Sequence, residues 1–587
     1  MFKPEGFSLE IFKKRYSFTE NETWEEACRR VSKQVSIAEL PDKVNKYEEK
    51  FYEELINNRF VPGGRIWYNS GRPNPQLLNC FVLGSELDSR EGWGNIAKEM
   101  IITSMSGGGC GVDFSDVRPK GATIAGQKGS APGAVELMKL LNGCADPIRA
   151  GGQRRTALLF SLNLHHPDIL DFLDSKFNDK ALQNANISVK CKNVKDFIKA
   201  VKKDGDWELH WKGKYKKSCK ARILWDKIVK NAYMTAEPGF LNWELVENEN
   251  TISYVKTMTC TNPCGEIVLP EYGSCDLGHL VLTRFIKDGE VDWHEMGNTI
   301  RIAVRFLDNV LSVNKYPLEE MKIEAEKFRR IGLGTTALAD MLAILGYRYG
   351  SPEANKFVDK LFRFISKQAY ESSVMLAIEK GAFPECNFME HVQTGYVKRM
   401  TKKIKSLIED HGIRNCALLT QAPTGTVSIL SGNCSSGIEP MFAPAYERRW
   451  LDGDKKQKEL VFHPLCEQFI KEGKDVSHFV GANDLSVRDH MEIQKVIQNH
   501  IDNSISKTIN IPKTYDIKEM SEIWLEYLPH LKGATFYRDG SRDAPLKPVK
   551  LEDAIKRKKI EKVKVEAAHV DDCPGGKCEI KKLDNKE

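Results

Sequence analysis

Long apolar runs are missing from this 587-residue sequence, and no stretch approaches the ~18 apolar residues of a membrane-spanning helix. The first residues, MFKPE, also lack the apolar core of a signal peptide and the Arg- and Ser-rich pattern of a transit peptide. Because 41% of the residues are hydrophobic, the chain can still bury a large core. We therefore expect a globular cytoplasmic protein without a membrane partner.

The sequence also has little excess of either charge. Its 87 basic and 81 acidic residues leave a formal net charge of +6, which is slight for this size and gives no reason to expect a nucleic-acid partner. Its 15 cysteines are odd in number and spread through the chain. That distribution fits a reducing compartment better than a disulfide scaffold. Small phosphate-bearing substrates remain compatible with the composition.

One stretch, TNPCGE at 261–266, carries an amide, a thiol and a carboxyl at alternate positions. In an extended segment Asn262, Cys264 and Glu266 point the same way. A carboxyl accepts protons, and a sulfur attacks as thiolate or, after one-electron oxidation, abstracts hydrogen. The pattern predicts chemistry on a sugar. Taken alone, it is about as typical of an ordinary loop with a buried, inert cysteine.

Seven further motifs accompany this stretch. In chain order the eight are LLNCFVL around Cys80, SGGGCGVDFSDVRPKG (106–121), HPDILDFL (166–173), NANISVK (184–190), NPCGEI, SCDLGHL around Cys275, PTGTVSIL (423–430) and KGATFYRDGSR (532–542). Together they resemble the catalytic chain of ribonucleotide reductases from about Phe51 to Arg542, and most closely the adenosylcobalamin-dependent class (class II). The resemblance implies reduction of ribonucleotides to 2′-deoxyribonucleotides, which supplies DNA precursors.

Strand-like and helical patterns alternate between residues 186 and 400. The helical patterns follow Ile223–Trp225 and cover Met296–Val313, Ala325–Leu345 and Ala354–Gly381. This alternation predicts an α/β fold with a largely parallel sheet. The resemblance implies a ten-stranded α/β barrel with the Cys264 loop at its centre.

The expected domains are a helical region at 1–60, a barrel at 61–542 and a flexible redox tail at 543–587. In the first region, Thr23 is a possible helix cap before an apolar stripe that begins at Trp24. The region leaves no room for the ATP-cone domain of larger relatives. On/off regulation by ATP and dATP is therefore expected to be absent.

The resemblance also assigns roles to five residues. It implies that Cys264 becomes a thiyl radical, that Glu266 accepts a proton from the ribose, and that Asn262 hydrogen-bonds the sugar. It further implies that Cys80 and Cys275 form the dithiol that reduces the substrate. Spacing in the sequence cannot establish this pair, because a disulfide requires Cα atoms within about 7 Å.

Substrate contacts are expected from three glycine-containing segments. Resemblance places Gly108 beside the ribose, although its glycine-rich surroundings also fit a tight turn. A hydroxyl-rich turn is expected to bind the phosphates, and its residues are Pro423, Thr424, Gly425, Thr426, Val427 and Ser428. Many relatives have Ser-Pro-Thr where this chain has Gly64-Arg65-Ile66. That departure weakens the expectation for Gly64 and Arg65, although glycines still expose N–H groups to anions.

Two loops rich in small and basic residues, at about 124–155, resemble the effector site of the family. There Lys128, Arg149 and Arg154, with Asp88 nearby, would bind a deoxynucleoside triphosphate at a dimer interface. The chain is accordingly expected to be a homodimer. The alternative is a pair of solvated basic loops.

The radical source follows from the same comparison. Relatives that receive the radical from a second protein have two adjacent tyrosines near the barrel end, whereas this chain has Phe536 before Tyr537. Phenylalanine lacks the O–H of such a relay, and no glycyl-radical motif was found near the C-terminus. Adenosylcobalamin is therefore the expected cofactor. The alternatives are the large subunit of a reductase with a separate metal-containing subunit and, more distantly, a non-catalytic nucleotide-binding protein.

The C-terminal segment carries Cys573 and Cys578. They could form half of a zinc site with His569, but no fourth ligand is evident. We favour a mobile dithiol that re-reduces Cys80 and Cys275 and is itself reduced by thioredoxin or glutaredoxin. About 30 flexible residues give a reach of about 30 Å, enough to enter a barrel mouth. No resident metal is expected.

Overall fold

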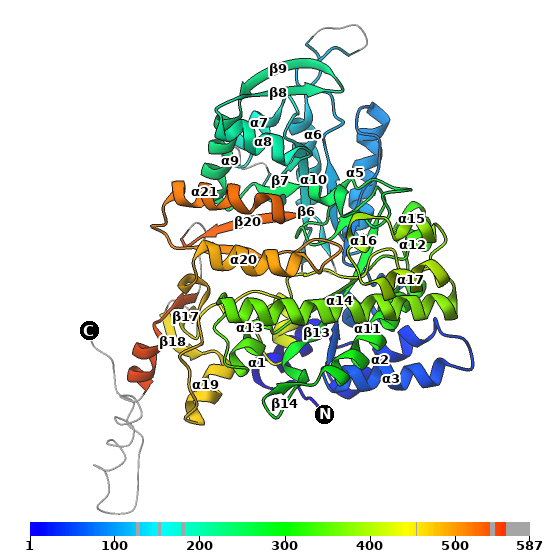
Figure 1. The fold of residues 1–587 in the computed structure, drawn as a ribbon, viewed down its shortest axis with the longest axis vertical. Coiled ribbons are helices and arrows are strands. Elements are labelled where there is room, and N and C mark those ends of the chain that lie inside the picture. Colours follow the sequence, from blue (N-terminus) through cyan, green and yellow to red (C-terminus); the bar gives the residue numbers. More distant parts are fainter. Residues whose placement is uncertain (125–128, 151–153, 178–181, 453–454, 541–545, 559–587) are drawn as a thin grey trace, which may run out of the picture.

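The computed structural model describes all residues except 125–128, 151–153, 178–181, 453–454, 541–545 and 559–587 (Figure 1). Side chains at 149–150, 154–155, 448–452, 455–458 and 546 are also outside the description. Three helices open the chain, α1 (Gly6–Arg15), α2 (Trp24–Ser36) and α3 (Val44–Ile56). Thr23 caps α2, because its hydroxyl accepts from the Glu26 N–H while the Glu26 carboxylate accepts from the Thr23 N–H. The predicted cap is confirmed.

Two sets of parallel strands build the barrel. The first set is β2 (Cys80–Val82), β3 (Gly109–Asp113), β6 (Leu158–Asn163), β7 (Ala185–Cys191) and β10 (Gly239–Asn242). The second contains β13 (Ser274–Val281), β16 (Ile331–Thr336), β19 (Thr508–Ile511) and β20 (Gly533–Arg538), with β1 (Phe60–Pro62) beside β13.

The two sets meet at antiparallel seams. One seam joins β2 to β13, and the other joins β10 to β20. Isolated bridges from Leu333 to Leu419 and from Gln421 to Ile505 connect β16 to the segment before β19. The sheet, counted as ten-stranded, therefore closes on itself. The expected α/β barrel is confirmed, with the addition that its strands are not all parallel.

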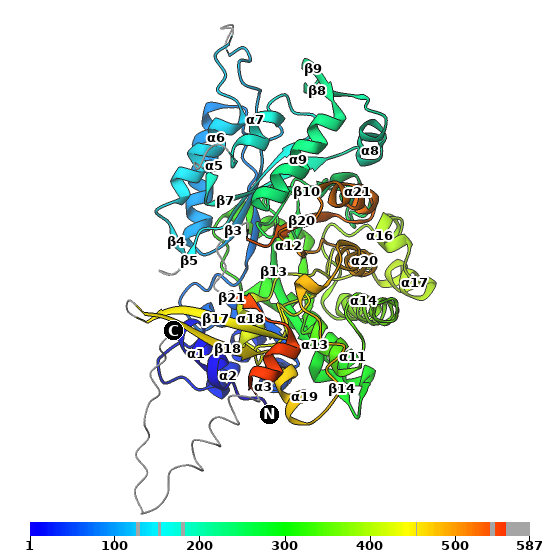
Figure 2. The same cartoon turned by 90° about the vertical axis from the view of Figure 1, so that its left-hand side faces the viewer.

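Helices cover the outside of the barrel. Figure 2 shows α5, α6 and α7 on one side of the strands and α14, α20 and α21 on the other. The helices after α3 are α4 (Gly64–Asn69), α5 (Arg90–Met105), α6 (Ala134–Ala145), α7 (Ile169–Asp174), α8 (Val194–Lys202), α9 (Ala221–Thr235), α10 (Trp243–Asn248), α11 (Trp293–Val313), α12 (Glu319–Phe328), α13 (Leu338–Ile344), α14 (Pro352–Lys380), α15 (Phe388–His391), α16 (Gly395–Lys398), α17 (Lys402–His411), α18 (Gly425–Leu430), α19 (Pro464–Lys471), α20 (Val487–Gln498) and α21 (Ile517–Tyr527).

Four two-stranded hairpins and one three-stranded sheet complete the described fold. They are β4 (Arg149–Ala150) with β5 (Arg154–Arg155), β8 (Asp206–Trp211) with β9 (Lys214–Lys220), β11 (Cys260–Thr261) with β12 (Val268–Leu269), β14 (Ile286–Lys287) with β15 (Glu290–Val291), and β17 (Ala445–Asp452) with β18 (Lys455–Phe462) and β21 (Leu546–Pro548). None of the described helices combines the length and the apolar composition that a bilayer crossing needs.

The helix expected over Ala325–Leu345 is wrong in its middle. α12 ends at Phe328, β16 follows, and only then does α13 begin. Gly332 and Gly334 sit where neighbouring backbone comes close: an added Cβ would lie 2.8 Å from the Asp276 carbonyl and 2.7 Å from the Thr420 carbonyl, respectively. A buried strand of this kind has no polar face, so periodicity does not distinguish it from a helix.

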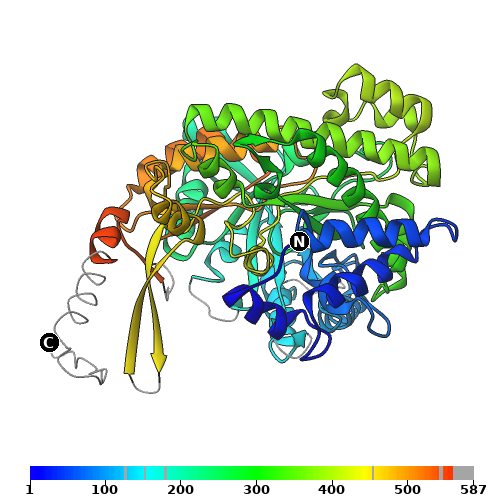
Figure 3. The same cartoon turned by 90° about the horizontal axis from the view of Figure 1, so that it is seen from below.

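Part of the segment expected to be a flexible tail is ordered. β21 pairs with β17, and a helix over 551–558 buries Ala554 against Ala445 and Phe462. These apolar contacts explain why the segment folds against the hairpin, although its charge-rich composition predicted a flexible chain. Figure 3 shows the β17–β18 hairpin projecting from the barrel. Cys573 and Cys578 lie outside the described residues.

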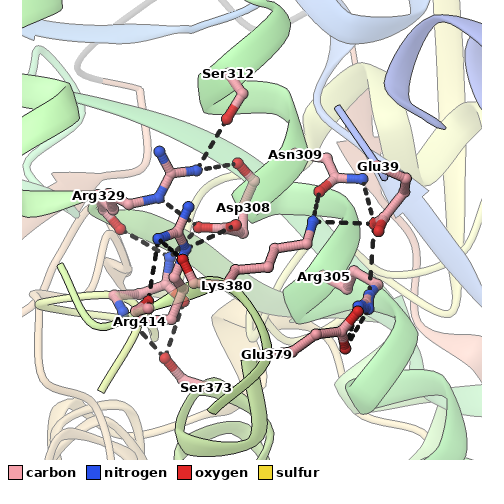
Figure 4. A network of polar contacts seen from close by, with 12 residues as sticks. Glu39, Arg305, Asp308, Asn309, Ser312, Arg329, Ser373, Glu379, Lys380 and Arg414 are labelled. Carbon is pink, nitrogen blue, oxygen red and sulfur yellow. Dashed lines mark hydrogen bonds and ion pairs between the residues drawn. The ribbon is translucent and has the colours of Figure 1, made fainter. Parts of the chain in front are cut away.

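A buried polar network ties the N-terminal helices to the barrel (Figure 4). Glu39, after α2, accepts from Asn309 Nδ2 on α11 at 2.8 Å and from Lys380 Nζ on α14 at 3.1 Å. Arg305 Nε lies 3.4 Å from the same carboxylate. We call the set Glu39, Arg305, Asp308, Asn309, Arg329, Lys380 and Arg414 the buried ion network.

Candidate active site

A loop inside the barrel carries the predicted thiol. The ladder of β11 with β12 brings Cys260 opposite Leu269 and leaves Cys264 at the tip. The Thr420 hydroxyl donates to the Glu266 carbonyl at 2.8 Å, and the Asn186 amide donates to the Pro263 carbonyl at 3.1 Å. The loop is therefore held from two sides of the barrel. We call residues 260–269 the finger loop.

The tip is a turn rather than the extended segment expected from the sequence. Gly265 N–H donates to the Asn262 carbonyl at 3.0 Å, and Gly265 has φ +84°, which glycine adopts without strain. Three side chains nevertheless gather, because the hairpin folds Asn262 and Glu266 towards each other. Asn262, Cys264 and Glu266 all line one cavity of about 300 Å³, which we call the front cavity.

Cys80 completes this group from β2. Asn262 Nδ2 lies 3.1 Å from Cys80 Sγ, and the same thiol lies 4.0 Å from Glu266 Oε1. Asn262 Oδ1 accepts from the Ile267 N–H at 3.0 Å, which fixes the orientation of the amide. The carboxyl, the amide and one thiol are thus in mutual contact.

Glu266 is buried without a cation. Its side chain is 1% exposed, and Oε2 has no hydrogen-bond partner among the described residues. Desolvation by burial raises the pKa of the Glu266 carboxyl to about 7, despite the opposing hydrogen bond from Asn262. A carboxyl with this pKa can accept or release a proton near neutral pH.

Cys80 and Cys275 face each other across the seam between β2 and β13. They are directly paired in the antiparallel register. Such pairs have Cα atoms about 4.5–5.5 Å apart, a range that permits a disulfide. Both are free thiols here, and burial raises the pKa of each. The structure supplies the proximity that sequence spacing could not establish.

The tip of the finger loop also borders a second cavity of about 330 Å³, which we call the back cavity. Among the described residues, Pro263, Cys264 and Pro423 alone line both cavities. The thiol is exposed to these internal spaces, yet the surrounding protein desolvates it and raises the pKa of Cys264. Cys264 therefore lies between the front cavity and the back cavity and borders both, in what we call the thin wall.

β10 and β20 contribute small and apolar residues to the lining of the back cavity, which also includes the charged residues Glu237 and Lys507. Gly239, Gly533 and Ala534 contribute little bulk, and Phe536 is 1% exposed with its ring 4.6 Å from that of Trp524. Tyr537 follows and borders a neighbouring cavity of about 490 Å³ as well. The back cavity and this neighbouring cavity share Thr508 and Tyr537 as lining residues.

The turn expected to bind phosphates lines the front cavity from Pro423 to Val427, and Gly64 and Gly108 line it too. Ser428 is not among the lining residues, and its hydroxyl donates to the Gly425 carbonyl at 3.2 Å. The Thr424 hydroxyl contacts Thr336 Oγ1 at 2.8 Å and accepts from the Gly437 N–H at 2.7 Å. Thr424 thus braces the turn.

Arg65 and His279 are two lining residues that sequence reasoning undervalued or missed. Arg65 is buried on α4, and an added Cβ on Gly107 would lie 2.1 Å from its guanidinium carbon. His279 belongs to β13. Alternation along that strand places it on the same face as Cys275, so the signal was present in the SCDLGHL motif.

The four effector candidates are not brought together by described contacts. Arg118 holds Asp88 in a bidentate pair, with Nε 2.8 Å from Oδ1 and Nη2 3.1 Å from Oδ2. Lys128 lies outside the described residues, and so do the side chains of Arg149 and Arg154. An effector role for these residues remains a prediction.

Comparison with known proteins agrees with this geometry. The profile of the ribonucleotide reductase barrel domain matches residues 78–537, and that of the ribonucleotide reductase all-alpha domain matches residues 2–75. A vitamin B12-dependent ribonucleoside-diphosphate reductase of Thermoplasma acidophilum is 34% identical over 91% of this chain and 72% of its own. One of Mycobacterium tuberculosis is 32% identical, covering 86% and 73%.

A more distant relative, the ribonucleoside-diphosphate reductase large subunit of Variola virus, is 27% identical over 69% of this chain and 58% of its own length. The barrel match alone covers most of the chain, and the first two relatives exceed 30% identity over most of both sequences. The chain belongs to the ribonucleotide reductase family.

Proposed function

We propose that this chain reduces ribonucleotides to 2′-deoxyribonucleotides by thiyl-radical chemistry that depends on adenosylcobalamin. One observation carries the proposal: Cys264 lies between a cavity lined by Cys80, Asn262 and Glu266 and a second cavity with no other reactive thiol among its lining residues. This arrangement separates the sugar from the radical source. The vitamin B12 dependence named for the two more similar relatives supports the choice of cofactor.

The back cavity fits that cofactor. Gly239 and Gly533 have no side chains that would take up space in the cavity, and a Cβ on Gly265 would have no neighbour within 4 Å. Phe536 adds an apolar ring to the lining. Adenosylcobalamin, when bound, supplies a radical by homolysis of its cobalt–carbon bond. Ser188 and Thr535 would hold its polar groups, whereas Phe536 and Ala534 would exclude water.

In the front cavity, each residue takes one step. The Cys264 thiyl radical takes the 3′ hydrogen atom of the ribose, Glu266 accepts the 3′-hydroxyl proton, and Asn262 hydrogen-bonds the sugar. The 2′-hydroxyl then leaves as water. Cys80 and Cys275 supply two electrons and two protons and become a disulfide, while Glu266 returns its proton to the 3′ oxygen and Cys264 returns its hydrogen atom to C3′. The cycle thus consumes one dithiol per deoxyribonucleotide.

Re-reduction of that disulfide is assigned to Cys573 and Cys578, with thioredoxin or glutaredoxin as the external reductant. Support comes from their position near the C-terminal end of the sequence, downstream of the described helix residues 551–558. Cys573→Ser should block cycling with thioredoxin but leave a single turnover, and dithiothreitol should restore multiple turnovers. If thioredoxin still sustained multiple turnovers in this variant, the tail assignment would be wrong.

Regulation and assembly are proposed from the family. A deoxynucleoside triphosphate would bind near Lys128, Arg149 and Arg154 at the interface of a homodimer, with Asp88 positioned by Arg118. A cytoplasmic location fits the many free cysteines of the described chain. Sedimentation with and without deoxynucleotides would test the dimer.

The decisive experiment is reduction of CDP and CTP by the purified chain alone. Dithiothreitol and a panel of deoxynucleotides are supplied, with and without adenosylcobalamin. Reduction that requires the cobalamin is expected, and its preferred substrate shows the phosphate length. Cys264→Ser should abolish it, so appreciable reduction by that variant would refute the thiyl mechanism.

The competing function is a large subunit that receives its radical from a metal-containing partner, as the name of the viral relative allows. Phe536 disfavours it, because the ring packed on Trp524 has no O–H to oxidise. Activity that appears only when a second protein is added would establish this alternative.

A further inference from the structure

His279 is the one imidazole among the residues that line the front cavity. Its side chain is 2% exposed, and Nδ1 has no hydrogen-bond partner among the described residues. A buried polar group without a partner is costly, at about 1–3 kcal/mol. Nδ1 lies against Gly334 of β16, whereas the ring borders the cavity, so a ligand there can accept a hydrogen bond from the other ring nitrogen, Nε2. This inference rests on the proposed function and deepens its substrate site.

The surroundings of His279 locate it at the phosphate end of the cavity. It pairs with Gly334 of β16, and an added Cβ on that glycine would lie 3.3 Å from His279 Nδ1. Two residues further along β16, Thr336 contacts the Thr424 hydroxyl at 2.8 Å. The strand that flanks His279 therefore also braces the turn at 423–427, which lines the same cavity.

Distance along β13 agrees with this placement. Cys275 and His279 are four residues apart on one face of the strand, or about 13 Å at 3.3 Å per residue. Cys275 must act at the ribose. A substrate lying along the strand then puts its phosphates, at the far end of the sugar, near His279.

The charge of the cavity points to an anion as the ligand. Arg65 lines the same cavity, with its guanidinium packed against Gly107. An arginine suits phosphate oxygens. Desolvation lowers the pKa of His279 to about 4, so the empty cavity holds a neutral ring that donates from only one nitrogen.

We propose that His279 is a substrate-binding residue whose imidazole donates a hydrogen bond to a phosphate oxygen of the ribonucleotide. Nε2 has no hydrogen-bond partner among the described residues, so this bond forms only when the substrate is present. Its contribution is therefore to affinity for the phosphorylated substrate and not for the nucleoside.

The test measures binding of CDP and of cytidine to the full chain without adenosylcobalamin. Labelled CDP is followed by equilibrium dialysis with saturating deoxynucleotides, and cytidine by displacement. His279→Leu should raise the Kd for CDP roughly 10- to 100-fold, the range for a lost hydrogen bond to a charged group, and change the Kd for cytidine less than about 2-fold. His279→Gln keeps a donor and should recover part of the loss.

His391→Leu is the matched control. His391 is equally buried, but its ring lies against those of Tyr254 and Phe383 rather than along the front cavity. It should leave both dissociation constants unchanged. An unchanged Kd for CDP in His279→Leu, or an equal loss for CDP and cytidine, would overturn the proposal.

Binding and turnover separate this proposal from the function on which it rests. A wild-type chain that binds CDP in a His279-dependent way but never reduces it would support the contact and refute the reductase activity. Cys264→Ser should bind CDP as the wild type does. A wild-type chain that binds no ribonucleotide would overturn both.

Discussion

Two buried carboxyl groups of this chain have pKa values that are shifted in opposite directions. Asp308, in the buried ion network, accepts from Arg329 Nε at 2.8 Å and from Arg414 Nε at 3.2 Å. Burial alone would raise its pKa, but these two cations outweigh burial and lower it. Glu266 has no ion pair among the described residues, and burial raises its pKa to about 7. The cations, and not the depth, decide which carboxyl stays ionised.

The difference in pKa matches a difference in role, because Asp308 stabilises the fold and Glu266 is proposed to transfer a proton. Asp308, ionised at neutral pH, holds α11 against the segments that carry Arg329 and Arg414 (Figure 4). Glu266 is held by the finger loop instead, with one oxygen left without a partner. A proton acceptor for a sugar hydroxyl needs that freedom.

The largest expected effect is the loss of catalysis in Glu266→Gln. The amide cannot accept the proton, so single-turnover reduction of CDP should slow by about 10²- to 10⁴-fold. The urea midpoint should not fall, because no buried cation loses a partner. Retention of more than about a tenth of the wild-type rate would mean that another group accepts the proton.

Asp308→Asn should lower the free energy of unfolding and leave the single-turnover rate nearly unchanged. Removing the charge leaves Arg329 and Arg414 buried without their carboxylate, which costs about 3–5 kcal/mol of unfolding free energy. Urea unfolding measures this loss, and the single-turnover rate at low temperature should stay within about twofold of the wild type. A stable variant with a slow rate would contradict the division between the two carboxyls.

The pH dependence should sharpen the comparison further. Because the ionised form of Glu266 is the acceptor, the rate should rise with pH to a midpoint near 7 and change about tenfold per pH unit well below it. Glu266→Gln should lose this rise, whereas Asp308→Asn should keep it. A single-turnover pH profile from 5.5 to 8.5, about 1.5 units either side of that midpoint, provides the measurement.

Stability should respond to pH with opposite signs at the two sites. The folded pKa of Glu266 lies above its unfolded value, so its contribution is complete below about 4.5 and is lost as pH rises through about 7. The folded pKa of Asp308 is lowered, so its contribution is present above the unfolded pKa and lost as pH falls. Urea midpoints of the two variants against wild type should diverge in these directions.

The smallest expected effect is that of Glu39→Gln. The glutamine amide oxygen can still accept a hydrogen bond from Asn309 Nδ2. Arg305 keeps its ion pair with Glu379, and Lys380 still donates to the side-chain oxygen Oδ1 of Asn309. The loss should therefore be about 1–2 kcal/mol, measured by the same urea unfolding. A loss as large as that of Asp308→Asn would show that Glu39 carries the network.

Local signals in the sequence predicted much of the framework. Thr23 and Glu26 form the expected cap, and the helices expected at Met296–Val313 and Ala354–Gly381 match α11 and α14 closely. Each is fixed by residues near in sequence. The strand at Ile331–Thr336 was not predicted, because its glycines are required by close packing against the backbone of Asp276 and Thr420, which are distant in sequence.

The site was predictable in content but not in arrangement. Motifs identified Cys80, Cys264 and Cys275, but the pairing of Cys80 with Cys275 depends on the register between β2 and β13, which long-range packing sets. Strand alternation in the SCDLGHL motif places His279 on the face of Cys275, but it does not show what that face encloses. Its significance emerges only from the cavity that other strands enclose.

The thin wall at Cys264 has an evolutionary consequence. Because Pro263, Cys264 and Pro423 are the only described residues that line both cavities, most residues of the back cavity have no direct contact with the space around the sugar. A lineage could exchange one means of oxidising the cysteine for another without relearning how to reduce a ribose. The Cys264 sulfur is then the one atom through which radical generation and ribose reduction must communicate.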